Sequence, residues 1–220
     1  MSMIILDTET ASLNGTLIEL AWINPKTGES YEQRFNPDCK IDVGAMAVHH
    51  IIDADLFGKP LHTSAFIPAG VEYIVGHNVD YDIEVLKRSN VSTDRFKRIC
   101  TLAVARKAFP ELKTHTIGAL MYHLSDSQSS ARDMLKGAHS ALADVQMTGF
   151  ILEKIIQRLG ISDQPQFLYI ASEDARIPTH ISFGKHKGSP LSALPNDYVK
   201  WLLGQPDIDP YLRKALVAAT

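Results

Sequence analysis

The sequence predicts an α/β protein in which a mixed sheet is flanked by helices and a small module follows near the C-terminal end. Three strand patterns in meander order open the chain, strand and helix patterns alternate after them, and a connecting segment precedes a mildly basic tail. The 220 residues are 45% apolar, which suffices for one well-packed core. We expect a main domain at residues 1–161, a connection at 162–178 and a hairpin-and-helix module at 179–220.

The first half of the chain contains a three-stranded meander with turn residues between the strands. Asn14-Gly15 provides the first turn and the segment Pro25–Gly28 provides the second. Two short helical patterns follow the meander. The expected elements are strands at Met3–Asp7, Thr16–Asn24 and Tyr31–Phe35, and helices at Val43–His49 and Asp53–Phe57.

The second half alternates between apolar strand patterns and helical patterns. Pro110 closes one helix and Gly160 ends the longest. Residues 123–137, which are rich in Ser, Asp and Gln, are expected to form an exposed loop. The expected elements are strands at Glu72–Gly76 and Ile99–Cys100, and helices at Asp80–Arg88, Leu102–Ala108, Thr116–His123 and Ala141–Arg158.

The composition excludes several classes of protein. No apolar run approaches membrane-spanning length, and the chain enters a strand almost at Met1 without a basic leader, so we expect a cytoplasmic protein. Cys39 and Cys100 are too few for a disulfide scaffold or a zinc cluster. The formal charge of −3 divides into +2 for residues 179–220 and −5 for the rest. An acidic remainder is compatible with phosphate binding if several carboxylates converge on divalent cations.

The first acidic cluster lies at the end of the first strand, where Asp7 and Glu9 are separated by one residue. Side chains alternate between the faces of a strand, so these two carboxylates point the same way and favour a cation between them. Oxygen ligands of this kind favour Mg²⁺ or Mn²⁺ over zinc. Two acids on the solvent face of a strand are the simpler alternative, and the spacing alone does not decide between them.

The second cluster, Gly76–Asp82, lies where an apolar strand passes into a helix. Asn78 and Asp80 both have a structural explanation as N-cap residues. Asp82 falls in the first helical turn, where the helix dipole favours a carboxylate. It would lie beside Asp7 if the two strands are neighbours.

The third cluster, His139–Asp144, lies directly before the longest helix. Five helical positions place His139 and Asp144 on different faces, so both can reach one site only if His139 precedes the helix in a loop. Ser140 as the N-cap residue favours that placement. A histidine considered by itself in such a position is more often a surface or packing residue.

Taken together, the three clusters resemble the signatures of the DEDDh exonucleases, which are D-x-E-T, H-N-x-x-[FY]-D and H-x-A-x-x-D in this order. The match covers roughly residues 3–158. The resemblance implies a ribonuclease-H-like fold, with metal-binding carboxylates and a histidine as the general base. The residues so implied are Asp7, Glu9, Asp82 and Asp144 for two Mg²⁺ or Mn²⁺ ions, and His139 for the base.

The activity implied by the resemblance is 3′→5′ hydrolysis of DNA to 5′-mononucleotides, with little sequence preference and with DNA repair as its setting. His139 would take the proton from the attacking water, and activity is expected to rise with pH through the histidine titration. One alternative is an RNA-directed 3′ exonuclease of the same fold, since 2′-hydroxyl contacts lie outside the signatures. Another is a non-catalytic module that binds 3′ ends. In such a module, at least one metal-binding residue would be replaced. All the signature residues are intact.

A narrower resemblance is to the bacterial exodeoxyribonuclease X group, through Ala45–His49, Ile99–Thr101 and the tail. In the tail, Lys185, His186 and Lys187 on a tight turn are placed to contact DNA phosphates without reading sequence. The structural alternative is a hairpin and an amphipathic helix that only pack on the main domain.

Several residues beside the signatures are expected to contact the nucleic acid. Leu13 is either a wedge against the terminal base or an ordinary core residue before the Asn-Gly turn. At Ala11-Ser12, close relatives in the family often carry a glycine. The loop before Leu13 is therefore expected to differ in shape, which affects the preference for DNA ends but not catalysis. Dimerisation is a further expectation by family analogy. The expected nucleic-acid contacts are Thr8, Leu13, Asn14, His49, Asn78, Lys185 and Lys187.

Overall fold

The structure is a computed structural model that describes residues 2–219. The chain forms two compact units, Met1–Ser172 and Glu173–Thr220. The boundary between them falls inside the segment 162–178 that was expected to connect two domains. Within the described range, none of the helices combines the length and the apolar character needed to cross a membrane.

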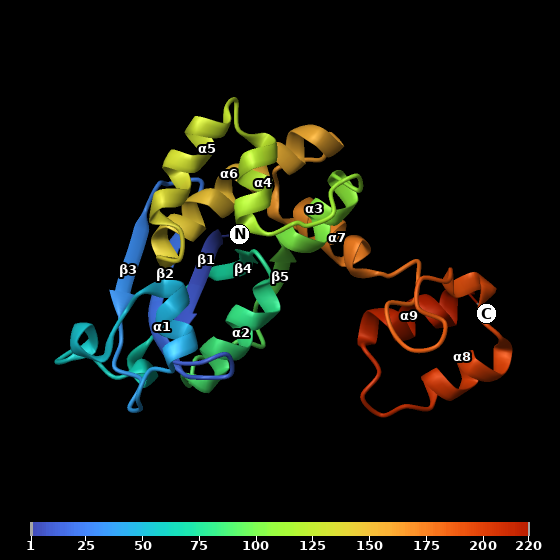
Figure 1. Cartoon of the computed structure of the whole chain (residues 1–220), viewed down its shortest axis with the longest axis horizontal. Coiled ribbons are helices and arrows are strands. Elements are labelled where there is room, and N and C mark those ends of the chain that lie inside the picture. The colour runs from blue at the N-terminus through green and yellow to red at the C-terminus, as the bar shows by residue number, and fades with distance from the viewer. Residues whose placement is uncertain (1, 220) are drawn as a thin grey trace. The chain divides into compact units, whose positions relative to one another are not determined.

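A five-stranded mixed sheet forms the centre of the first unit, in the order β3-β2-β1-β4-β5 (Figure 1). The first three strands are antiparallel, and β1, β4 and β5 run parallel to one another. The predicted meander is therefore present, and β1 and β4 are neighbours, which is the condition for Asp82 to lie beside Asp7. The strands are β1 (Ser2–Thr10), β2 (Leu17–Ile23), β3 (Ser30–Arg34), β4 (Val71–Gly76) and β5 (Lys97–Cys100).

The helices of the first unit cover the sheet, and the longest of them, α6, packs along β1 and β2. The core under α6 joins sheet residues such as Ile5, Val75 and Ile99 to Val145 and Leu152 of the helix. These helices are α1 (Val43–His49), α2 (Val79–Arg88), α3 (Thr101–Ala108), α4 (Ile117–Leu124), α5 (Gln128–Met134), α6 (Ala141–Leu159) and α7 (Pro165–Arg176). The predicted fold class, a mixed sheet flanked by helices, is confirmed.

Residues 123–137 and 162–178 differ from their predictions. Residues 123–137 were expected to be a loop, but they contain α5, which begins where the Ser127 hydroxyl accepts a hydrogen bond from the Ser130 N–H. A serine-rich sequence favours such helix starts as well as loops. The segment 162–178 contains α7, and the Ser172 hydroxyl of this helix accepts a hydrogen bond from the buried Cys100 N–H at 2.8 Å.

The second unit is mainly helical, with α8 (Asn196–Leu203) and α9 (Pro210–Ala219), which are orange to red in Figure 1. The predicted hairpin is a loop closed by one antiparallel bridge between His180 and Pro190. Glycines at 184 and 188 have positive φ, so the loop turns too tightly for regular strands. A small apolar core that includes Leu191, Val199 and Leu216 holds this unit together.

Candidate active site

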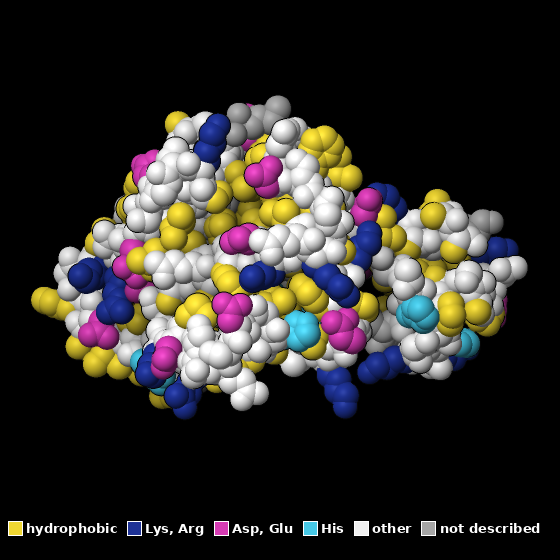
Figure 2. All heavy atoms as spheres, turned by 90° about the horizontal axis from the view of Figure 1, so that it is seen from above, with side chains coloured by type: hydrophobic (Ala, Val, Ile, Leu, Met, Phe, Trp, Pro, Cys, Tyr) yellow, Lys and Arg dark blue, Asp and Glu magenta, His cyan; other side chains and the backbone are white. Residues whose placement is uncertain are grey.

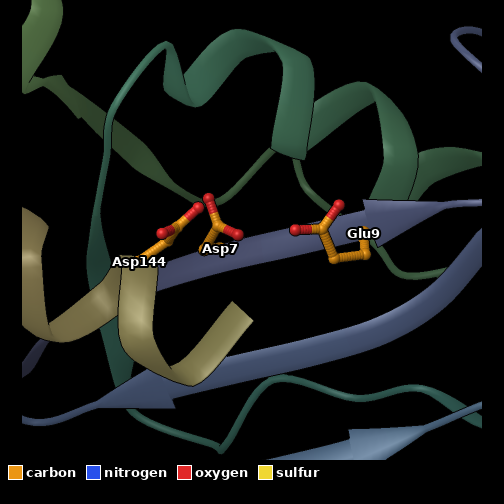
Figure 3. Close-up of side chains that lie close together, drawn as sticks. All are labelled: Asp7, Glu9 and Asp144. Carbon is orange, nitrogen blue, oxygen red and sulfur yellow. The ribbon is translucent and has the colours of Figure 1, made fainter. Parts of the chain in front are cut away.

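Three carboxylates converge at the end of β1. Asp7 and Glu9 lie on the same side of the strand, and Asp144 reaches them from the first turn of α6 (Figure 3). One carboxylate oxygen from each residue lies within 4.8 Å of those from the other two. The predicted alternation along the strand and the predicted neighbourhood of the third cluster are both seen in this arrangement.

Burial is the first cause of a raised pKa in each of the three carboxyl groups. Burial, followed by the charges of Asp82, Asp144 and Glu9, raises the pKa of Asp7 well above its usual value. Burial, followed by the charges of Asp144, Glu19 and Asp82, raises the pKa of Glu9 to about 8. Burial also raises the pKa of Asp144, although the backbone N–H of His139 opposes this shift. Partly buried oxygen donors that repel one another in this way are suited to a divalent cation.

Asp82 lies in the first turn of α2 and is held beside the end of β1 by a side chain of that strand. Its Oδ1 accepts a hydrogen bond of 2.8 Å from the Thr8 hydroxyl, and both side chains are buried. Gly76 allows this approach, because a Cβ there would lie 3.2 Å from Oδ2 of Asp82 and 3.1 Å from the Cβ of Val79. Burial raises the pKa of Asp82 to about 7. Asp82 lies outside the three-carboxylate cluster, but its charge acts on Asp7.

His139 precedes α6 in a loop, as the sequence predicts. Its backbone is left-handed, with φ of 67°, and its N–H donates a 3.4 Å hydrogen bond to Oδ1 of Asp144. The side chain is exposed and, together with Asp144, lines a pocket of about 620 Å³. Arg106 and Lys113 line the same pocket. A non-glycine residue in this conformation carries local strain, which is common at functional sites.

The residues expected to contact nucleic acid are in varied surroundings. Leu13 is 79% exposed, so the alternative in which it is a core residue is wrong. Asn14 and Asn78 are also exposed. Asn78 precedes α2 in a left-handed conformation, and its side chain makes no capping hydrogen bond. The alternative explanation, that the Asn78 side chain caps α2, is therefore not supported.

Two other expected contacts are less accessible. Thr8 is buried and its hydroxyl donates to Asp82, so this side chain positions a carboxylate. His49 is 7% exposed, and its Nδ1 accepts a hydrogen bond from the Ile51 N–H at the end of α1. Burial lowers the pKa of His49. Little of this imidazole is left for a nucleotide, so the expectation for His49 is weakened by its burial.

Glu19 was not among the residues predicted from the sequence. It lies in β2 at 1% exposure and connects the sheet to α6. One signal could have identified it. An acid in the middle of the apolar segment Leu17–Ile23 is unusual, because charged groups are rarely fully buried without partners.

The Exonuclease family model matches residues 4–152, which include the three carboxylates, Asp82 and His139. The chain belongs to the exonuclease family. The order and spacing of its acidic residues and histidine identify it as a DEDDh exonuclease, as the motifs predict.

Similar proteins share most of the length of this exonuclease. Exodeoxyribonuclease 10 of Escherichia coli (strain K12) is 28% identical over 221 residues, covering 96% of each chain. DNA polymerase III subunit epsilon of Salmonella typhimurium is 31% identical over 171 residues, which are 66% of this exonuclease and 67% of the relative. The solved structure of exonuclease X in complex with 5′ overhanging duplex DNA superposes with a TM-score of 0.60 at 26% identity. The superposition covers 77% of this exonuclease and 99% of the exonuclease X chain.

Proposed function

We propose that this exonuclease hydrolyses DNA from 3′ ends, releasing 5′-mononucleotides with the aid of two Mg²⁺ ions, and that it acts in DNA repair. The observation that carries the proposal is the convergence of Asp7, Glu9 and Asp144, with Asp82 beside them and His139 at the rim. Mn²⁺ has the same preference for oxygen ligands and is the expected substitute.

The donor set fits a pair of divalent ions. Asp7 lies between Asp144 and Glu9 (Figure 3), and the charge of Asp82 also raises its pKa, so Asp7 would help to hold both ions. Glu9 and Asp144 would complete one site, and Asp82, held by Thr8, would serve the other. Bound at these carboxylates, the ions would lower the pKa of a water and stabilise the charge that develops on the phosphate and the leaving oxygen.

His139 is the proposed general base. Its imidazole is exposed and lines the same pocket as Asp144. From there it could reach a water or a phosphate bound at the carboxylates. A positioned base of this kind contributes about 10²–10⁴-fold to the rate of hydrolysis.

His139→Asn is expected to lower kcat by about 10²–10⁴-fold and to leave Mn²⁺ affinity unchanged, because the carboxylates remain. Asparagine tolerates the left-handed backbone, so the loop is preserved. His50 is the matched control, since it is also exposed with positive φ (58°), and His50→Asn should keep full activity. Single-turnover rates and Mn²⁺ titration measure the two effects. Normal turnover in His139→Asn would remove this residue from the mechanism.

DNA is the proposed substrate because of the relatives. One is named an exodeoxyribonuclease, another is a DNA polymerase subunit, and the similar structure holds duplex DNA. RNA is the alternative, since 2′-hydroxyl contacts are not part of the shared motifs. The test is digestion of matched DNA and RNA strands, single-stranded and duplex, in Mg²⁺. Faster loss of DNA supports the proposal, and faster loss of RNA would retain the fold and replace the substrate.

Leu13 and Asn14 are proposed to contact the 3′ end. They form an exposed tip directly after β1, the strand that carries Asp7 and Glu9. An apolar side chain at 79% exposure costs solvation free energy unless it packs on something, and a terminal base offers an apolar face. This placement favours a wedge at the terminal base pair.

Attraction to the DNA backbone is proposed to come in part from the second unit. On the face of the first unit seen in Figure 2, lysines and arginines are interspersed with acids, so the charge of that face is mixed. In the second unit, Lys185 and Lys187 are exposed on the tight loop, and the Lys185 ammonium lies 5.5 Å from the centre of the Tyr198 ring. Trp201 stacks on Tyr198 and is 55% exposed, which offers a surface for bases.

Replacing Lys185 and Lys187 by alanine is expected to weaken DNA binding and to reduce its salt dependence. Each lost phosphate contact should lower the slope of log K against log salt by about 0.9 for duplex DNA. kcat at saturating DNA should be unchanged. The matched control replaces Lys26 and Lys59, two exposed loop lysines of the first unit. An unchanged slope in the Lys185/Lys187 variant would exclude this loop from DNA binding.

A further inference from the structure

Glu19 is a buried acid that the proposed mechanism does not use. It lies in the middle of β2 at 1% exposure, in a strand whose other residues are apolar. A carboxylate in such a place is destabilising unless hydrogen bonds and an opposite charge compensate for the lost water. The partners of this group therefore indicate what it does.

Glu19 has two partners, one on each oxygen. Its Oε1 accepts a 2.8 Å hydrogen bond from Nε of Arg34, and its Oε2 accepts a 3.0 Å hydrogen bond from the backbone N–H of Ala141. Ala141 is the first residue of α6, and the N-cap residue Ser140 makes no side-chain capping bond. A side chain of the sheet thus satisfies an N–H that would otherwise lack a partner at the start of this helix.

The sheet register places this contact beside the candidate metal site. Glu9 of β1 pairs with Glu19 of β2, and Glu19 pairs with Arg34 of β3, so the three residues lie in one row across the sheet. Two carboxylates directly opposite one another repel. Arg34 and the positive end of α6 provide the charge that permits Glu19 to be there.

The start of α6 also carries the site residues. Asp144 lies in its first turn, and His139 lies two residues before Ala141. Apolar contacts with the sheet are not directional, whereas the 3.0 Å hydrogen bond from the Ala141 N–H to Glu19 ties the first residue of α6 to one point on β2. A displacement of about 1 Å at such a site can cost about 10²-fold in rate.

We propose that Glu19, supported by Arg34, is a positioning residue that fixes the first turn of α6, and thereby Asp144 and His139, relative to Asp7 and Glu9. The inference rests on the proposed function of these four residues. It assigns to Glu19 a role in assembling the metal site without contact with the metal or the substrate.

Glu19→Gln is the test, because the amide keeps the shape and one acceptor oxygen but cannot accept from both Arg34 and Ala141. The expected result is Mn²⁺ affinity and kcat each lower by about 10–100-fold, with KM for DNA within about threefold of the parent. Mn²⁺ binding is measured by electron paramagnetic resonance on folded protein without DNA. A purely structural role predicts a lower melting temperature with unchanged Mn²⁺ affinity and kcat, and that result would overturn the inference.

Asp53→Asn is the matched control. Like Glu19, Asp53 accepts hydrogen bonds from one basic side chain, that of Lys40, and from one backbone N–H, that of Ile41, but neither partner belongs to α6. The Asp53→Asn variant should keep the Mn²⁺ affinity and the kcat of the parent. Arg34→Gln is the second variant if Glu19→Gln fails to fold, since Arg34 is 40% exposed and its loss is better tolerated. It should weaken Mn²⁺ binding severalfold, and unchanged binding would contradict the inference.

The two proposals can fail separately. If the parent protein degrades DNA and Glu19→Gln matches it in kcat and Mn²⁺ affinity, the positioning role is wrong and the function stands. If the parent leaves DNA intact while Glu19→Gln still weakens Mn²⁺ binding, the positioning role stands and the substrate assignment is wrong.

Discussion

Asp7→Asn is expected to lower kcat on DNA on the order of 10³-fold or more and, without divalent ions, to raise the melting temperature at pH 8. The loss of activity follows from removing the acid whose pKa is raised by the charges of all three other proposed ligands, Asp82, Asp144 and Glu9. The gain in stability follows because burial, Asp82, Asp144 and Glu9 raise the pKa of Asp7, so that keeping this carboxyl in the folded chain costs free energy at pH 8. The amide of asparagine carries no charge at any of these pH values, so Asp7→Asn removes this cost.

The gain should be about 1–2 kcal/mol, or roughly 3–6 °C, and it should shrink at pH 5, because a lower pH favours the uncharged form of a carboxyl whose pKa is raised by folding. Asp94→Asn, at an exposed loop acid, is the matched control and should change neither property. Thermal melts in chelator at pH 5 and pH 8, with single-turnover rates in Mg²⁺, measure both effects. A destabilised Asp7→Asn in chelator, or an active one in Mg²⁺, would contradict the prediction.

The metal-free protein is expected to lose stability as the pH rises from 7 to 8.5, and Mg²⁺ should restore it. The folded pKa of Glu9 is raised from 4.5 to about 8 and that of Asp82 from 3.8 to about 7, with burial as the first cause of each. Each group therefore binds its proton more tightly in the folded state. Its stabilising contribution is complete below the unfolded pKa and is lost as the pH passes the folded pKa.

The chosen window separates the carboxyls from the buried histidines. Burial lowers the pKa of His49 and of His77, which reduces stability at acid pH. An unfolded histidine titrates near pH 6.5, so this effect is small above pH 7. Each proton lost changes the free energy of unfolding by up to ~1.4 kcal/mol per pH unit.

Melting curves in chelator should shift downward by about 3–5 °C per pH unit in this window, and millimolar Mg²⁺ should reverse the shift. Asp7→Asn should show a flatter dependence and no Mg²⁺ response. A melting temperature that rises with pH in chelator would show that the carboxyls are not protonated in the folded state.

Much of the fold follows from local patterns. The meander at β1 to β3 was predictable because Asn14-Gly15 and Pro25–Gly28 mark the turns and because β1 and β2 contain strongly apolar runs. The helix α5 was not, since serine and aspartate are typical of both loops and helix starts, and contacts with α4 decide between them. The loop at 180–190 was predicted as a hairpin because its glycines indicate a turn but not the length of the paired strands.

The candidate site was predictable to a similar extent. Spacing in a strand places Asp7 beside Glu9, and the family motifs add Asp82, His139 and Asp144. An acid within the apolar strand β2 is a local signal for Glu19, but its partners lie 15 and 122 positions away, so its role could not be predicted from the local pattern. Dimerisation and a cytoplasmic location stay predictions, since surfaces and cellular signals are not fixed by the motifs.

The most direct test of the central claim, metal-dependent hydrolysis from 3′ ends at the Asp7 site, is digestion of one DNA strand labelled separately at each end. The predicted result in Mg²⁺ is early release of the 3′ label as a mononucleotide, while the 5′ label passes through a ladder of shortening fragments. Chelator or Asp7→Asn should abolish both. Early release of the 5′ label, internal cleavage, or equal activity in chelator would contradict the claim.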